Sequence, residues 1–235
     1  MRRLNLRLVV MSGAAVVLLL CQYVALAQEA TSRTEEIEWT WEVRPAHADA
    51  KLPNVLLLGD SITRAYFPEV GKQLAGVANV YLMASSTSVG DSRLGRQIEE
   101  FSAAEGVKFS VVHFNNGMHG WAYSEQEYRE AFAAFVAEIR GIAPKAALIW
   151  ATTTPVKKES EPGPTNARVE ARNVIAESLV KTDGILIDDQ HGLMVKHANL
   201  YQDSVHFNEQ GAAIQGKQAA ELIRGLLAKG PRQGL

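Results

Sequence analysis

Short apolar runs recur along the chain from residue 53 onward, and segments with helical periodicity separate them. Each run is apolar at consecutive positions rather than at alternate ones, which is typical of a strand that is buried on both faces of a sheet. The expected strands are Asn54–Leu58, Val80–Met83, Phe109–Phe114, Ala146–Ala151 and the shorter Gly184–Ile187.

Amphipathic segments lie between the runs, and the clearest of them is Ser124–Ile142, where Ser124 and Glu127 have the spacing of a capping box. The other expected helices are Phe67–Leu74, Leu94–Phe101, Thr165–Val180 and Glu209–Leu227. Alternation of buried strands and helices predicts an α/β fold. We expect a three-layer sandwich whose central parallel sheet has about five strands in the flavodoxin-like order.

The first 27 residues have the pattern of an export signal. A basic start with Arg2 and Arg3 precedes the apolar stretch Leu8–Leu20, and the segment ends in Ala25-Leu26-Ala27. This pattern predicts cleavage after Ala27 and a secreted or periplasmic protein, with an uncleaved membrane anchor as the alternative. Cleavage would remove the only cysteine, Cys21, and take the formal net charge from −2 to −5, so we expect neither a disulfide nor stable membrane insertion afterwards.

The rest of the chain is expected to form an N-terminal extension, residues 28–52, that lies over one domain, residues 53–230. Hydrophobic residues make up 47% of the chain and charged residues 21%, as in soluble globular proteins. The slightly negative charge gives no reason to expect nucleic acid as a partner. The six histidines lack zinc-site spacing and no carboxylate cluster is evident, so no metal or other cofactor is expected. The oligomeric state is not indicated.

Two short motifs at opposite ends of the domain carry the candidate chemistry. Gly59-Asp60-Ser61 follows the first predicted strand, where ligands bind in a parallel α/β sheet. Asp203 and His206 lie three residues apart before the last helix, so one turn of chain can present both side chains together. A serine nucleophile needs a base, and the base needs an acceptor to fix its tautomer. The plain alternative is that Asp60 or Ser61, and later Asp203, only cap helices.

The two motifs together resemble the SGNH/GDSL hydrolase family, over about residues 53–227. The resemblance implies a Ser61–His206–Asp203 catalytic triad and an oxyanion hole that includes the N–H groups of Ser61 and Gly90, because Ser88-Val89-Gly90-Asp91-Ser92 stands where the family has its second motif. The family also uses an asparagine from a Gly-x-Asn-Asp motif after the third strand. Here that position reads Phe114-Asn115-Asn116-Gly117-Met118, and an ungapped register places Gly117 where the asparagine belongs.

A side-chain amide at the end of the third strand can still donate to an oxyanion, and we expect Asn116 to do so, with Asn115 as second choice. His119 and Trp121 follow closely and, with Asp60, are candidate substrate-binding residues, although core packing is the alternative for Trp121 and a structural role for His119.

The expected activity is hydrolysis of an ester through an acyl-enzyme. By resemblance to secreted bacterial family members, the substrate would be a small-molecule or glycan ester, with O-acetylated carbohydrate preferred. A lipid or simple acyl ester is the runner-up. O-acyl transfer with the same triad and glycan binding without turnover remain open, because fold alone does not decide function.

Overall fold

The computed structural model describes residues 32–229. The predicted export signal and its cleavage site lie outside the described residues, as does the start of the predicted extension. Within residues 32–229, no helix combines the length and the apolar character that crossing a bilayer requires.

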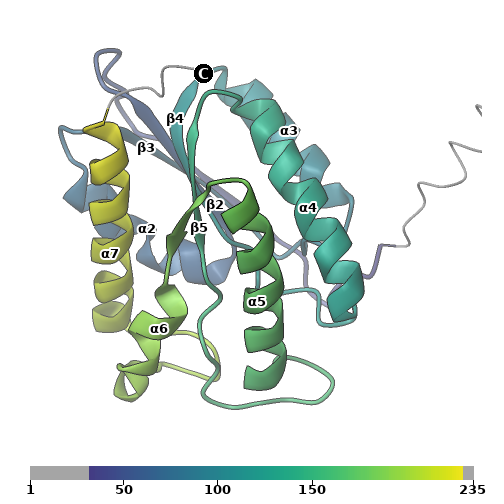
Figure 1. Ribbon diagram of the computed structural model, residues 1–235. Helices are drawn as coiled ribbons and strands as arrows, with labels where there is room; N and C mark the ends of the chain where they lie inside the picture. Colours follow the sequence, from purple (N-terminus) through teal and green to yellow (C-terminus); the bar gives the residue numbers. More distant parts are fainter. Residues whose placement is uncertain (1–31, 230–235) are drawn as a thin grey trace, which may run out of the picture. The chain divides into compact units, whose positions relative to one another are not determined.

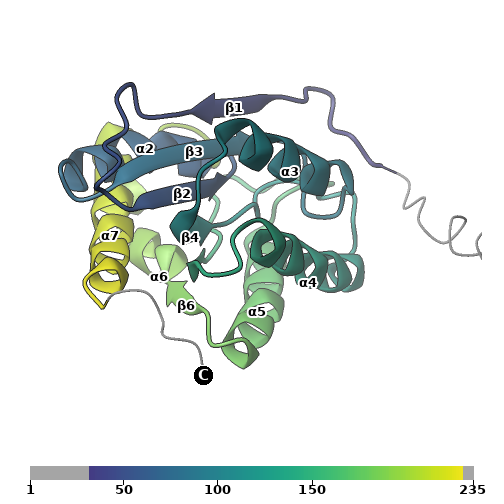
Figure 2. The same cartoon turned by 90° about the horizontal axis from the view of Figure 1, so that it is seen from above.

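A six-stranded sheet forms the centre of the fold, in the order β1-β3-β2-β4-β5-β6 (Figures 1 and 2). The strands are β1 (Thr40–Val43), β2 (Asn54–Gly59), β3 (Asn79–Ser85), β4 (Phe109–Phe114), β5 (Ala147–Ala151) and β6 (Leu186–Asp188). Strands β2 to β6 pair in parallel. Their order is the predicted flavodoxin-like one. Strand β1 was not predicted; it pairs antiparallel with β3 and makes the sixth strand.

Helices cover both faces of the sheet, which confirms the three-layer prediction. Helices α3 (Arg93–Glu105), α4 (Glu125–Ile142) and α5 (Asn166–Thr182) lie on one face, and α2 (Ser61–Gln73) and α7 (Glu209–Leu227) on the other (Figure 1). Helix α2 begins at Ser61 rather than at the predicted Phe67, because the Asp60 side chain caps it there. Two short elements that were not predicted, α6 (Gln190–Val195) and the 3-10 helix η1 (Ala198–Leu200), precede α7.

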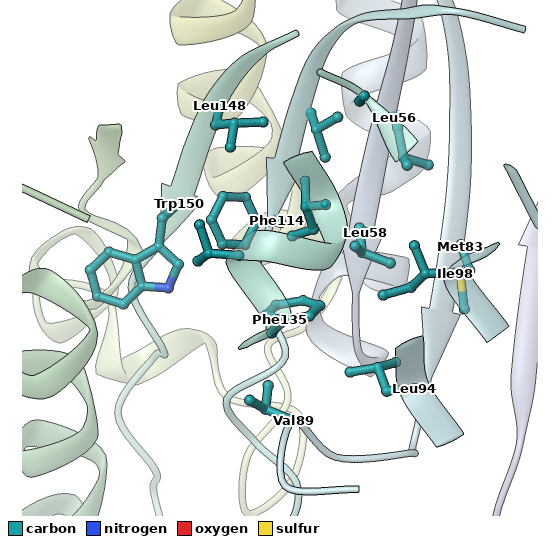
Figure 3. Close-up of a cluster of buried hydrophobic side chains, with 14 of the residues drawn as sticks. Leu56, Leu58, Met83, Val89, Leu94, Ile98, Phe114, Phe135, Leu148 and Trp150 are labelled. Atoms are coloured by element: carbon teal, nitrogen blue, oxygen red, sulfur yellow. The ribbon is translucent and has the colours of Figure 1, made fainter. Parts of the chain in front are cut away.

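Successive side chains of β2 point to opposite faces of the sheet and so pack alternately into the two apolar layers that lie between the sheet and the helices. Leu56 and Leu58 pack with Phe114 and Trp150 toward α3, α4 and α5 (Figure 3), whereas Val55 and Leu57 pack toward α2 and α7. All four of these β2 side chains are buried. A strand with two buried faces reads as a continuous apolar run, which is why the sequence predicts β2 well.

The N-terminal segment before β1 runs past the loops at the carboxyl ends of β3 and β4. Arg33 forms an ion pair with Glu127 and donates to the carbonyl of Ala122, and the Trp39 N–H donates to Ser86 Oγ. The segment therefore contacts the end of the sheet to which the parallel strands bring Ser61 and the following loops.

Candidate active site

Ser61 is the first residue of α2, directly after β2. Its neighbour Asp60 is 2% exposed; one carboxylate oxygen accepts from the Ile62 N–H at 2.9 Å and the other from the Met118 N–H at 3.2 Å. Asp60 was expected to bind substrate, but here it fixes the start of α2 and ties it to the loop after β4. A side chain on Gly59 would collide with Thr63 and with the carbonyl oxygen of Asn115, so only glycine fits the strand end there.

His206 and Asp203 come from the loop before α7, and the fold brings them to Ser61. His206 Nε2 lies 2.8 Å from Ser61 Oγ, and His206 Nδ1 lies 2.8 Å from Asp203 Oδ2. With Nδ1–H donating to the carboxylate, the Nε2 lone pair faces the serine hydroxyl and can accept its proton. The three side chains thus have the geometry of a serine nucleophile, a base and an orienting carboxylate.

The backbone around His206 holds Asp203 as a carboxylate. Asp203 Oδ1 accepts from the N–H groups of Val205 and His206, at 2.9 and 2.8 Å. Partial burial acts to raise the pKa of Asp203, but these two N–H groups and the His206 imidazole outweigh it, so the pKa lies below its ordinary value. Asp203 therefore stays ionised at neutral pH, as an orienting group must.

Gly90 lies in the loop between β3 and α3, where the ring of Tyr123 covers it. A Cβ on Gly90 would lie 2.6 Å from Tyr123 Cδ2, so the position requires glycine. Gly120, with φ of 74°, packs in the same way against Ser88. The two glycines let the Tyr123 ring and the Ser88 side chain pack directly on backbone, which brings the loop after β3 close to the loop after β4.

The two asparagines after β4 have partners other than the expected one. Asn116 Nδ2 donates to the carbonyl oxygens of Ser85 and Thr87, at 3.3 and 3.0 Å. The Asn115 amide donates to the Ala151 carbonyl and to Thr153 Oγ1. These contacts connect the end of β4 to those of β3 and β5. A role of Asn116, or of Asn115, in the oxyanion hole stays a prediction.

A cleft of about 430 Å³ opens beside Ser61 and His206. Two of the three expected substrate-binding residues, His119 and Trp121, line it. The Trp121 indole N–H donates to the Met118 carbonyl at 2.8 Å, and the Arg172 guanidinium stacks on its ring at 4.2 Å. Trp121 is therefore held in a fixed orientation at the wall of the cleft.

Glu35 and Glu36 also line the cleft, as do Ser160 and the prolines of the loop between β5 and α5. The sequence did not single out these residues. Glu35 accepts from the Gly120 N–H at 3.1 Å and lies 2.9 Å from His119 Nδ1. Glu35 and His119 lie 84 positions apart, so no local sequence pattern predicts their contact, and only the path of the N-terminal segment reveals it. Within residues 32–229, no group of three or more His, Cys, Asp or Glu side chains could hold a metal ion.

The fold is similar to those of several solved hydrolases. The lipase/acylhydrolase from Enterococcus faecalis has 17% identity and a TM-score of 0.61, and the match covers 74% of this chain and 96% of that one. The acetylxylan esterase Axe2 from Geobacillus stearothermophilus has 18% identity and a TM-score of 0.59, covering 73% and 94%. A carbohydrate esterase family 3 protein from Talaromyces cellulolyticus has 19% identity and a TM-score of 0.57, covering 75% and 99%.

These identities establish the fold alone, and no curated protein matches the sequence. The family assignment comes from the sequence itself, because the model of the GDSL-like Lipase/Acylhydrolase family matches residues 57–214. That range contains Ser61, Gly90 and both members of the His206–Asp203 pair. It is more than half of the chain, and this protein therefore belongs to the GDSL-like lipase/acylhydrolase family of SGNH/GDSL hydrolases.

Proposed function

We propose that this protein is an exported serine esterase that removes acetyl groups from carbohydrate, with Ser61 as the nucleophile. The observation that supports this most is the continuous hydrogen-bonded chain from Asp203 through His206 to Ser61, with both side-chain distances at 2.8 Å. The chain ends at the cleft, where an ester carbonyl can approach the serine hydroxyl.

In the proposed reaction, His206 Nε2 takes the Ser61 proton as Oγ bonds to the ester carbonyl carbon. The carbonyl oxygen becomes an oxyanion, which the backbone N–H groups of Ser61 and Gly90 bind. When the intermediate collapses, the alcohol leaves with the proton from His206, and an acyl-Ser61 remains. Water, activated by His206 in the same way, then releases the acid and restores the serine.

The walls of the cleft favour a carbohydrate as the alcohol part of the ester. Trp121 offers an aromatic ring of the kind on which sugar rings stack, and the carboxylates of Glu35 and Glu36 can accept hydrogen bonds from sugar hydroxyls. Among the similar structures, one is an acetylxylan esterase, one a carbohydrate esterase family 3 protein and one an acetyl esterase with acetate ion. These names support the substrate class by analogy only.

Acyl chain length separates the proposal from its runner-up, a lipid or simple acyl esterase. The purified protein should be assayed on p-nitrophenyl esters from acetate to octanoate and on O-acetylated xylo-oligosaccharides. We expect the highest kcat/KM for acetyl esters, release of acetate from the oligosaccharides and no turnover by Ser61→Ala. A kcat/KM that rises with chain length would favour the lipid esterase. Transfer of acetyl to an added sugar faster than to water would favour the acyltransferase.

The export part of the proposal rests on the first 27 residues of the sequence. Expression of the whole chain in a Gram-negative host, followed by N-terminal sequencing of the protein released from the periplasm, tests it. We expect the mature chain to begin at Gln28. A full-length product that stays with the membrane fraction would support the uncleaved anchor instead.

A further inference from the structure

Three side chains beside the cleft have no part in the proposed reaction. Trp39 lies directly before β1, Trp41 lies within β1, and Arg64 lies on α2 one turn after Ser61. The Arg64 guanidinium lies over both indole rings, 5.0 Å from the centroid of Trp39 and 5.2 Å from that of Trp41. We call these three side chains the Trp39–Arg64–Trp41 platform.

The platform is open to solvent at Trp41. Side chains two positions apart in an extended segment point to the same face, and on this face Trp39 and Val43 pack on the apolar layer of α2 and α7. Trp41 lies between them in the sequence, yet 52% of it is exposed. Strand β1 is the edge of the sheet (Figure 2), so a ligand can reach the indole from outside. An exposed tryptophan in a defined orientation is typical of a binding surface.

The polar atoms of the platform are not used by the protein. In the part of the chain that the structure describes, neither the Arg64 guanidinium nor the two indole N–H groups take part in a hydrogen bond or an ion pair. A guanidinium that stacks through its flat face keeps its N–H donors at the edge. The platform therefore offers flat apolar faces and unused donors side by side. A sugar ring presents the complementary groups, because it has apolar C–H faces and hydroxyl groups at its edge.

The platform is continuous with the cleft. The rings of Trp39 and His119 meet edge to face, with their centroids 6.1 Å apart, and His119 lines the cleft. Glu35, four residues before Trp39, lines it as well. Arg64 follows Ser61 by three positions, so the two residues are neighbours on the surface of α2. A chain that leaves the cleft past His119 therefore meets the platform.

We propose that the Trp39–Arg64–Trp41 platform binds sugar rings of a polysaccharide whose acetylated residue lies in the cleft. This inference rests on the proposed carbohydrate esterase function and adds a second binding site to it. Trp41 stacks on the face of a sugar ring, Arg64 donates to its hydroxyl groups, and Trp39 connects the platform to the cleft. The match to the family model begins at residue 57, so the family assignment does not account for either tryptophan.

The edge strand itself is poorly suited to a second copy of this chain as the occupant. Strand β1 has only four residues. Its charged residue Glu42 lies 3.4 Å from Arg44, which also pairs with Glu105. Short edge strands with charged side chains disfavour pairing between sheets. A sugar chain needs only the exposed side chains and not the backbone of the strand.

The first test compares a long substrate with a short one. We measure kcat/KM on p-nitrophenyl acetate, which is confined to the cleft, and on O-acetylated xylo-oligosaccharides of increasing length. In Trp41→Ala the ratio of the long-oligosaccharide value to the p-nitrophenyl acetate value should fall about tenfold, because one stacking contact is lost. The fall should come from KM, since the contact is the same in the ground and transition states. Trp41→Phe keeps a ring and should retain most of the ratio.

Val174→Ala is the matched control, because Val174 is another exposed apolar residue but lies on α5, across the sheet from α2. It should leave the ratio as in wild type. If Trp41 only stabilises the fold, Trp41→Ala lowers the melting temperature and leaves the ratio as in wild type. That result overturns the inference and leaves the proposed function standing.

Sedimentation velocity tests the other occupant. We expect wild type and Trp41→Ala to sediment as the same species at equal concentration. A wild-type dimer that dissociates in Trp41→Ala would mean that the platform is an interface between copies of this chain, and would overturn the inference.

Direct binding separates failure of the inference from failure of the proposed function. Isothermal titration calorimetry with long xylo-oligosaccharides is carried out on Ser61→Ala and on the double variant with Ser61→Ala and Trp41→Ala. We expect the double variant to bind about tenfold more weakly. Equal affinities overturn the platform whether or not the protein is an esterase. A wild type that cleaves none of the esters overturns the proposed function, whereas binding that depends on Trp41 would still support the platform.

Discussion

Two histidine–aspartate pairs in this molecule have the same nitrogen-to-oxygen distance but lie in opposite surroundings. His113 Nε2 lies 2.8 Å from Asp188, and both side chains are 0% exposed. His206 Nδ1 lies 2.8 Å from Asp203, and these side chains are 33% and 50% exposed. The nitrogen that binds the carboxylate differs, and so does what the other nitrogen meets: nothing in His113 and a serine hydroxyl in His206.

The comparison indicates that a histidine can act as a base because of what its second ring nitrogen contacts, and not because the histidine is paired with an aspartate. Asp188 also accepts from Gln190 and Gln218, so the His113 pair forms part of a buried polar cluster that joins β4 to β6. The His206 pair lies in a short loop at the edge of the cleft, where its free nitrogen reaches Ser61. We therefore expect changes to the first pair to affect stability and changes to the second to affect turnover.

The largest effect is expected for His206→Ala. It removes the base from Ser61, so kcat should fall by about 10⁶ while KM changes little. Because the side chain is partly exposed, the midpoint of chemical unfolding should change little. Ester hydrolysis and urea unfolding of the same preparation measure the two quantities. His206→Ala with a kcat near that of wild type would mean that another group activates the serine.

A smaller loss of turnover is expected for Asp203→Asn. The amide can still contact His206, but it no longer favours the tautomer with Nδ1–H, so kcat should fall by about 10⁴. The pH profile provides a check, because the variant should regain activity at high pH only if a different acceptor can orient the ring. Asp188→Asn is the matched change in the other pair and should leave kcat per folded molecule close to that of wild type.

The smallest effect on turnover and the largest on stability are expected for His113→Ala. The variant leaves the Asp188 carboxylate buried with one partner fewer and opens a cavity, so the free energy of unfolding should fall by about 3 kcal/mol. His197→Ala, at a partly exposed histidine near the 3-10 helix, serves as control and should change it by less than about 0.5 kcal/mol. A His113→Ala protein that is as stable as the control but inactive would reverse the comparison.

Much of the fold could be predicted because its strands are buried on both faces. Leu56 and Leu58 face one apolar layer and Val55 and Leu57 the other, so the run is apolar at every position and its nature is clear from the sequence. Strand β1 has no such signal, because Thr40, Trp41 and Glu42 are exposed and the strand is ordered by pairing with the edge of β3. A four-residue edge strand is defined by its neighbour more than by its own residues.

The residues of the candidate site likewise fall into those that the sequence could predict and those that it could not. Ser61, Asp203 and His206 could be singled out because each lies in a short motif whose spacing carries chemical meaning. The partners of Asn116 could not be predicted, because they depend on how closely the loop after β3 approaches the end of β4. Glu35 left no signal either, since its contact with His119 depends on the path of a polar segment along the sheet edge.

The central claim is that Ser61 is a nucleophile made reactive by His206. The most direct measurement is mass spectrometry of the protein after reaction with a fluorophosphonate, with peptide mapping of the site. We expect one adduct, on Ser61, forming rapidly in wild type, far more slowly in His206→Ala and at the wild-type rate in His113→Ala. An adduct on another residue, or equal labelling rates in wild type and His206→Ala, would contradict the account.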